Sequence, residues 1–139
     1  MKVNIYTDGG SRNNPGPAAA GAFIESFNEE YDQYLGVATS NEAEYQAVIL
    51  GLSKLKQLVG KSKTKQTSVV VYMDSQLAVQ QLNRQYKLKS EKIIPLFIQV
   101  HNLCVEYQSV EFVHIPREKN KKADAIVNRC LDNNKTLFV

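Results

Sequence analysis

The sequence predicts an α/β fold in which a five-stranded mixed sheet is covered by helices on both faces. Three observations support this fold class. Three β-favouring segments open the chain, helical periodicity begins near Asn41, and two further β-favouring runs are each followed by a helical pattern. Strands and helices in this order form layered domains with the sheet in the middle. The first three strands are expected to be antiparallel, because only a short polar turn joins the second to the third.

The first strand is expected over residues 2–7, where β-favouring side chains alternate with other residues. Gly9 and Gly10 are expected to end this strand, so that Asp8 stands at its carboxyl end. The two strands of the following hairpin are expected over residues 19–27 and 31–39, joined by a turn at residues 28–30.

A helix is expected from Asn41 to the residue before Gly60, with Glu44 on its apolar stripe. Glu42 lies two residues earlier, a rotation of about 200°, and therefore points away from the core. The remaining elements are expected to be a central strand at 69–73, helices at 75–83 and 91–106, a strand at 110–115, and a helix after the polar loop 116–120.

Length and composition are typical of one globular domain. The chain has 139 residues, of which 43% are hydrophobic, so residues 1–139 are expected to form a single domain with a continuous core. Two distant cysteines, Cys104 and Cys130, lie among apolar helical residues and are expected to be buried free thiols. Without a long apolar run, membrane insertion is not expected, and we expect a cytoplasmic monomer.

The net charge of +3 is compatible with a nucleic-acid partner but does not require one. The placement of the basic residues is more informative, because many fall in or beside expected loops. For each of them alone, a solvated loop charge is an equally good explanation. These residues are Lys61, Lys63, Lys65, Lys87, Lys89, Lys92, Arg117, Lys119, Lys121 and Lys122.

Acidic residues mark one expected edge of the sheet. Asp8 and Asp74 each follow a central strand, where open α/β sheets place ligands. Glu44 lies on an apolar helix face, where a buried carboxylate needs a cation or a hydrogen-bond donor. An acid cluster without cysteine suits a hard cation such as Mg²⁺ and the chemistry of phosphodiester hydrolysis. Alternatively, a strand-end aspartate such as Asp74 could simply cap the next helix.

Four segments, in this order, resemble type 1 ribonuclease H. Together they span almost the whole chain and carry the family's Asp, Glu, Asp and Asp at matching places. The segments are TDGGSRNNPGP at 7–17, SNEAEY at 40–45, YMDSQ at 72–76 and HIPREKNKKAD at 114–124.

The resemblance implies a ribonuclease H-like fold and a stand-alone nuclease that hydrolyses the RNA strand of an RNA/DNA hybrid. It implies that Asp8, Glu44, Asp74 and Asp124 bind two Mg²⁺ ions, which Mn²⁺ can replace. The products would carry 5′-phosphate and 3′-hydroxyl ends, and the RNA strand would be recognised by its 2′-hydroxyl groups. No obligate protein partner is implied.

Other motif positions imply auxiliary roles. His114 matches a histidine that assists proton transfer or product departure in the family. Asn14, Asn41 and Gln76 match contacts to the minor groove of the hybrid, and Thr39 matches a contact to a DNA phosphate. A turn beside Pro15 and a helix cap would also explain Asn14 and Asn41 without any ligand.

The chain departs from the family pattern in three places. Asn13 stands where the family commonly has glycine, and Ser40 stands where many members have asparagine. The segment 83–92 is short and lacks the tryptophan-containing basic helix of some members. We therefore expect weaker, more salt-sensitive hybrid binding than in members that have this helix. A catalytically weak binding module of the same fold, or a nuclease acting on another duplex, remains an alternative.

Overall fold

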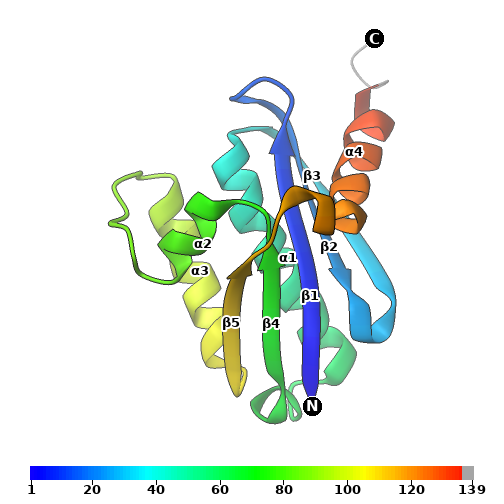
Figure 1. Cartoon of the computed structure of the whole chain (residues 1–139), viewed down its shortest axis with the longest axis vertical. Coiled ribbons are helices and arrows are strands. Elements are labelled where there is room, and N and C mark those ends of the chain that lie inside the picture. The colour runs from blue at the N-terminus through cyan, green and yellow to red at the C-terminus, as the bar shows by residue number, and fades with distance from the viewer. Residues whose placement is uncertain (136–139) are drawn as a thin grey trace.

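The computed structural model describes residues 1–135 and contains the predicted five-stranded mixed sheet (Figure 1). The strand order is β3-β2-β1-β4-β5, with antiparallel pairing among the first three strands and parallel pairing of β1 with β4 and of β4 with β5. This arrangement confirms the fold class. The strands are β1 (Lys2–Ser11), β2 (Gly16–Ile24), β3 (Glu29–Ala38), β4 (Ser68–Met73) and β5 (Ser109–His114).

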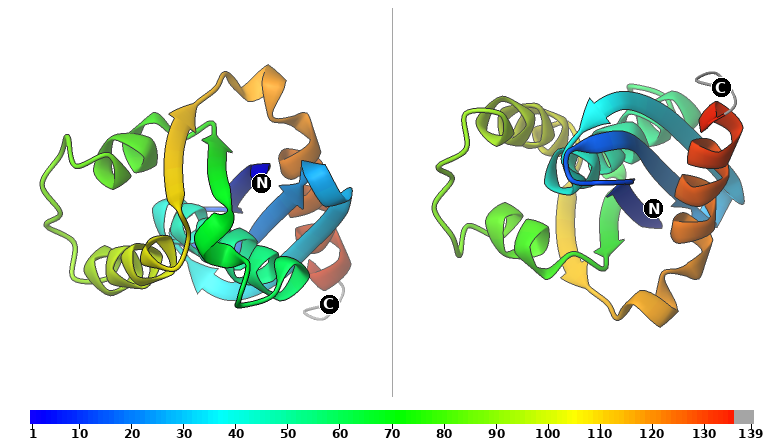
Figure 2. Two further views of the ribbon diagram at one scale, coloured as in Figure 1. Left: turned by 90° about the horizontal axis from the view of Figure 1, so that it is seen from below. Right: turned by 90° about the horizontal axis from the view of Figure 1, so that it is seen from above.

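Helices cover both faces of the sheet, as predicted. Gly51 of α1 packs against the side chain of Ala22, whereas Gly21, the preceding residue of β2, faces Ala123 and Ile126 of α4. Successive residues of a strand point to opposite faces, so α1 and α4 lie on opposite sides of the sheet. Figure 2 shows α3 alongside α1. The helices are α1 (Ser40–Val59), α2 (Gln76–Leu82), α3 (Ile93–Val105) and α4 (Lys121–Lys135).

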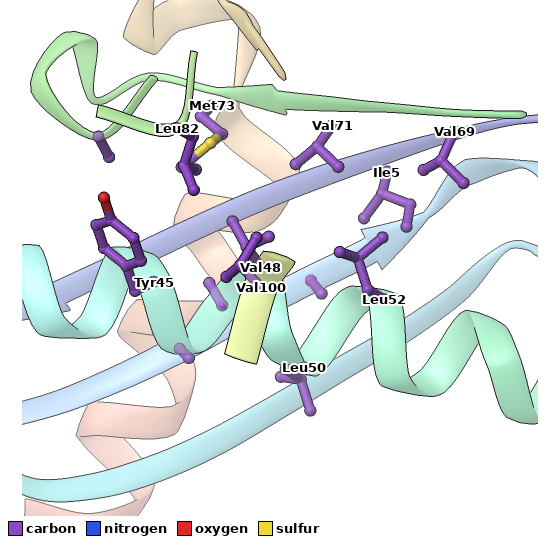
Figure 3. Packing of buried hydrophobic residues seen from close by; sticks show 14 of the residues in the cluster. Ile5, Tyr45, Val48, Leu50, Leu52, Val69, Val71, Met73, Leu82 and Val100 are labelled. Atoms are coloured by element: carbon purple, nitrogen blue, oxygen red, sulfur yellow. The ribbon is translucent and has the colours of Figure 1, made fainter. Parts of the chain in front are cut away.

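The main core lies between α1 and the sheet (Figure 3). Val48 and Leu52 of α1 are fully buried, as are Ile5 and Val71 of the two central strands. Burying each such side chain contributes about 1.5–3 kcal/mol to folding. This packing fixes α1 along β1 and so determines where the amino-terminal end of the helix reaches the sheet.

The first strand is longer than the sequence pattern predicts. Gly9 and Gly10 do not end β1, which continues to Ser11 and pairs there with Ala18–Ala20 of β2. Pairing with β4, however, stops at Thr7. Asp8 therefore lies inside β1. Up to Thr7 this strand pairs with β4 on one side and β2 on the other, and from Asp8 onward it pairs with β2 alone. Two adjacent glycines usually favour the end of a strand, but here pairing with β2 keeps the backbone extended, and that partner is not visible in the local sequence.

The hairpin turn is also shifted. β2 ends at Ile24 rather than at residue 27, and residues Glu25–Phe27 form a 3₁₀ turn. Asn28 closes this turn in the left-handed conformation, with a φ of 52° and its N–H donating to the Glu25 carbonyl (3.1 Å). Asparagine tolerates this conformation better than most residues, so β3 begins directly after it.

Both cysteines are free thiols, as predicted, although Cys104 is only partly buried. Burial raises the pKa of each thiol to about 11. Within residues 1–135 no helix has the length and apolar character needed to cross a membrane.

We predict that Gly9→Ala destabilises the protein, whereas Gly10→Ala does not. A Cβ atom on Gly9 would lie 2.2 Å from the carbonyl carbon of Ala43, a backbone atom of α1 that cannot move alone. On Gly10 the nearest atom is a Val127 methyl at 3.5 Å, an ordinary contact. Urea unfolding should show a loss of about 3 kcal/mol for Gly9→Ala. Equal stabilities for the two variants would contradict the close approach.

Candidate active site

Two parallel strands and two helices bring acidic residues to one edge of the sheet. β1 and β4 run side by side, and their carboxyl-terminal halves point toward the same edge (Figure 1). Asp8 lies in β1, and Asp74 directly follows β4. Glu44 comes from the first turns of α1 and Asp124 from the first turn of α4. The four acids thus come from four separate elements.

Three of these acids form a compact cluster. One carboxylate oxygen from each of Asp8, Glu44 and Asp74 lies within 4.8 Å of the corresponding oxygen of the other two. Asp8 and Glu44 are 7% and 6% exposed, and Asp74 is partly buried. Asp124 lies outside this group of three but lines the same cleft and interacts electrostatically with Asp8.

Burial and mutual repulsion make the cluster costly to ionise. Burial, followed by the charges of Asp74 and Asp124, raises the pKa of Asp8 to about 8. Burial, followed by the charges of Asp8 and Asp74, raises the pKa of Glu44 well above its ordinary value. The Gly9 N–H opposes both shifts by hydrogen bonding. Perturbed carboxylates gathered in a cleft are typical of functional sites.

The donor set suits a divalent cation. Oε2 of Glu44 is buried and has no hydrogen-bond partner, although a buried carboxylate oxygen normally has one. A cation among the three carboxylates would supply the missing interaction and relieve their repulsion. Carboxylate oxygens without cysteine or histidine favour hard cations over zinc. The cluster is therefore consistent with divalent metal binding.

The acids lie in an open cleft of about 420 Å³. Arg12 and Arg117 are on its walls, so positive charge flanks the acidic floor. Both arginines are exposed, and Arg12 forms an ion pair with Asp132 (2.7 Å). The cleft can thus accept a ligand that carries both negative charge and bound cations, such as a phosphodiester.

Asp74 does not cap the following helix. The N-cap of α2 is Ser75, whose hydroxyl oxygen accepts a hydrogen bond from the Ala78 N–H (3.2 Å). The alternative explanation of Asp74 from the sequence is therefore wrong, and its carboxylate is available to the cluster.

The residues expected to touch a hybrid gather around the amino-terminal end of α1. Thr39 is the N-cap of α1, and its hydroxyl oxygen accepts from the Glu42 N–H (3.1 Å). Oδ1 of Asn14 accepts from the Ser40 N–H (3.0 Å). Asn41 is therefore not the cap, and its Nδ2 donates to Gln81 of α2 (3.3 Å).

Two other expected site residues, the substrate contact Gln76 and the auxiliary residue His114, lie elsewhere. Gln76 is the exposed first residue of α2. His114 is the exposed last residue of β5 and pairs with Met73 in the sheet. Neither residue lines the acidic cleft.

The backbone conformation and contacts partly explain how the structure accommodates the departures from the family pattern. Asn13 has a φ of 68°, a left-handed conformation that glycine and asparagine adopt more easily than other residues. Ser40 keeps its main-chain contact to Asn14 and lines the cleft. Residues 83–92 form no helix, consistent with the missing basic segment, and they separate α2 from α3, which are both shorter than the helices expected at 75–83 and 91–106.

Sequence reasoning missed two residues at this site. Arg117, interpreted only as a loop charge, lies on the wall of the cleft. Asn120 is 1% exposed, and its Nδ2 donates to the carboxylate of Asp74 (3.2 Å). Both lie in the segment 114–124 that supports the family resemblance, but no periodicity or spacing singles them out.

The order of the five strands matches the ribonuclease H fold, and the acid cluster is consistent with divalent metal binding. A family profile described as "Reverse transcriptase-like" matches residues 6–130. The "Bifunctional protein Rv2228c" of Mycobacterium tuberculosis is 36% identical over 137 residues, covering 95% of this chain and 36% of that protein. "Ribonuclease HI" of Halobacterium salinarum is 31% identical over 136 residues, covering 95% of this chain and 65% of that protein.

Solved structures show the same similarity. The N-terminal RNase H domain of Rv2228c from M. tuberculosis superposes with a TM-score of 0.88 at 33% identity, covering 100% of this chain and 99% of that chain. LC11-RNase H1 in complex with an RNA/DNA hybrid gives 0.87 at 40% identity, covering 94% and 97%. The chain belongs to the type 1 ribonuclease H family. It spans about a third of the mycobacterial relatives and two thirds of the halobacterial one.

The raised pKa of Asp8 predicts an unusual dependence of stability on pH. The unfolded chain loses this proton near its ordinary pKa of 3.8, whereas the folded protein keeps it to about pH 8. In chelator, the Asp8 carboxyl group therefore makes its full contribution to the free energy of unfolding below about pH 4. This contribution is lost as the pH rises toward 8, by at most about 1.4 kcal/mol per pH unit.

Asp8→Asn removes this titration, so the variant should become more stable than the parent as the pH rises from 5 to 8. Urea unfolding in chelator measures the difference. Asp132→Asn, which changes an exposed acid on α4, should keep the pH slope of the parent. A parental slope in Asp8→Asn would contradict the assignment.

Proposed function

We propose that this chain is a ribonuclease H catalytic domain, comprising residues 1–139, that hydrolyses the RNA strand of RNA/DNA hybrids. The observation that carries the proposal is the convergence of Asp8, Glu44 and Asp74 within 4.8 Å at the positions of the family motifs. A relative that is 40% identical has been solved with an RNA/DNA hybrid, which supports the same substrate class here.

Asp8, Glu44, Asp74 and Asp124 would hold two Mg²⁺ ions, with Mn²⁺ able to substitute. Such ions activate the attacking water and stabilise the leaving oxygen of a phosphodiester, giving 5′-phosphate and 3′-hydroxyl ends. The chain's own contribution is to fix the four carboxylates on four elements. It also keeps Asp8 and Glu44 away from bulk water, where their negative charge would be screened.

Substrate positioning falls to the residues around α1 and α2. Asn14, Asn41 and Gln76 would read the minor groove, where the 2′-hydroxyl distinguishes RNA from DNA, and Thr39 would contact a DNA phosphate. The first three have side-chain amides, which both donate and accept hydrogen bonds as a hydroxyl partner requires. Hydrogen bonds of Asn14 to the Ser40 N–H and of Asn41 to Gln81 support this role by limiting the motion of these two side chains.

Positive charge is divided between the two ends of the sheet. The loop that holds Lys61, Lys63 and Lys65 lies beside the amino terminus, since the Met1 ammonium group donates to the Gln66 carbonyl (2.9 Å). The acids lie at the opposite end of β1. Arg117 and Lys119 are nearer the cleft, and the exposed lysines of segment 83–92 follow α2. Few cations thus flank the acids, which supports weak binding of the hybrid.

The first test follows strand cleavage. Purified protein is incubated at low salt with a hybrid labelled separately on each strand, in Mg²⁺, Mn²⁺ or chelator. We expect metal-dependent cleavage of RNA alone. Asp74→Asn should lower kcat on the order of 1,000-fold, equivalent to about 4 kcal/mol of transition-state stabilisation. Glu111→Gln, an exposed acid of β5, serves as the control and should retain activity.

Other results would redirect the assignment. Tight binding without cleavage in every condition would indicate a binding module of the same fold. Cleavage of the DNA strand, or preferential cleavage of double-stranded RNA, would indicate a nuclease for another duplex. Cleavage in chelator would contradict a metal-dependent mechanism.

A second test separates proton transfer from metal binding. His114 is exposed at the end of β5, outside the acid cluster, so His114→Ala should leave Mn²⁺ affinity unchanged. If the His114 side chain transfers a proton in the reaction, kcat of this variant should fall about 100-fold and the pH profile of kcat should lose one limb. His101, the only other histidine, lies exposed on α3, and His101→Ala is the matched control. Equal kcat values for both variants would remove His114 from the mechanism.

A further inference from the structure

Asn120 links three of the elements that carry the acids. It lies between a 3₁₀ turn at Arg117–Lys119 and α4, and it is 1% exposed. Its Nδ2 atom donates to the main-chain carbonyl of Thr7 (2.9 Å), the residue before Asp8, and to Oδ2 of Asp74 (3.2 Å). The amide group therefore bridges the backbone beside Asp8 and the carboxylate of Asp74.

The main chain of Asn120 fixes the third element. Its carbonyl oxygen accepts from the N–H of Asp124 (3.1 Å), which begins the hydrogen bonding of α4. One residue thus contacts the strand beside Asp8, the carboxylate of Asp74 and the backbone of Asp124.

The side chain does not serve the helix that it precedes. An asparagine before a helix usually accepts a helix N–H with Oδ1, which is why this residue type is favoured there. Here Oδ1 is buried and has no partner. An unpartnered buried oxygen is unfavourable, so the orientation of the amide is explained by its two donations and not by capping.

An amide is well suited to support a carboxylate that binds a cation. It restrains the Asp74 carboxylate through one oxygen without adding positive charge, whereas a lysine or arginine would compete with the cation. We propose that Asn120 is a positioning residue that orients Asp74 and anchors Asp124 for divalent cation binding. This inference rests on the proposed function, because it assigns Asn120 to the metal site of that reaction.

Variants of Asn120 test the proposal. Asn120→Leu removes the donor but keeps a branched side chain, and Asn120→Ala removes the donor with less steric demand. Calorimetry without substrate should show Mn²⁺ affinity reduced by about 10- to 100-fold in both, as is usual when a partner of a metal ligand is lost. Hybrid cleavage should need correspondingly more Mn²⁺, with the KM for hybrid nearly unchanged. Asn83→Ala removes a similar amide donation to the Phe112 carbonyl, outside the acidic cleft, and should retain parental values.

A measurement on the parent protein does not depend on how the variants fold. During titration with Mg²⁺, the side-chain amide resonances of Asn120 should shift with the same dissociation constant as the Gly9 N–H, while those of Asn83 stay constant. Shifted Gly9 resonances with a stationary Asn120 amide would overturn the proposal. So would parental Mn²⁺ affinity in folded Asn120→Ala with only its melting temperature lowered. If the parent binds no divalent cation, the proposed function itself fails.

Discussion

The mutual repulsion of buried carboxylates is the constraint on which the site depends. Asp8 and Glu44 are almost fully buried beside Asp74, and hydrogen bonding to the Gly9 N–H only partly offsets their charge. Such a cluster persists only if the surrounding fold holds it against the tendency to open or to keep its protons. The core between α1 and the sheet supplies that restraint. A bound cation would relieve the repulsion among the carboxylates, and this relief would favour binding of the cation.

Much of the fold could be predicted from the sequence, because period-two and helical patterns reflect which faces are buried. The three closest acids followed from the same patterns, since strand ends and an apolar helix stripe placed them at one edge. Asp124 rested on the family resemblance, and the structure places it beside the cluster of three.

The rest depends on contacts between distant residues. The continuation of β1 through Gly9 and Gly10 requires β2 as a partner, which local patterns do not reveal. Asn120 resembles an ordinary residue before a helix, and only the positions of Thr7 and Asp74, 113 and 46 residues away, show its orientation. Long-range hydrogen bonding of this kind has no periodicity in the sequence.

The contact of Gly9 with the backbone of α1 makes the spacing of the acids independent of the distant part of the core. Asp8 and Glu44 are each adjacent to this contact, so their separation is set by main-chain atoms and not by the shape of aliphatic side chains. Leu52 and Leu55 pack two or more helical turns further along α1. Replacing these leucines by other apolar residues during evolution can therefore alter stability while the carboxylates keep their spacing. Core residues can thus differ among relatives without a change in the reaction at the acid cluster.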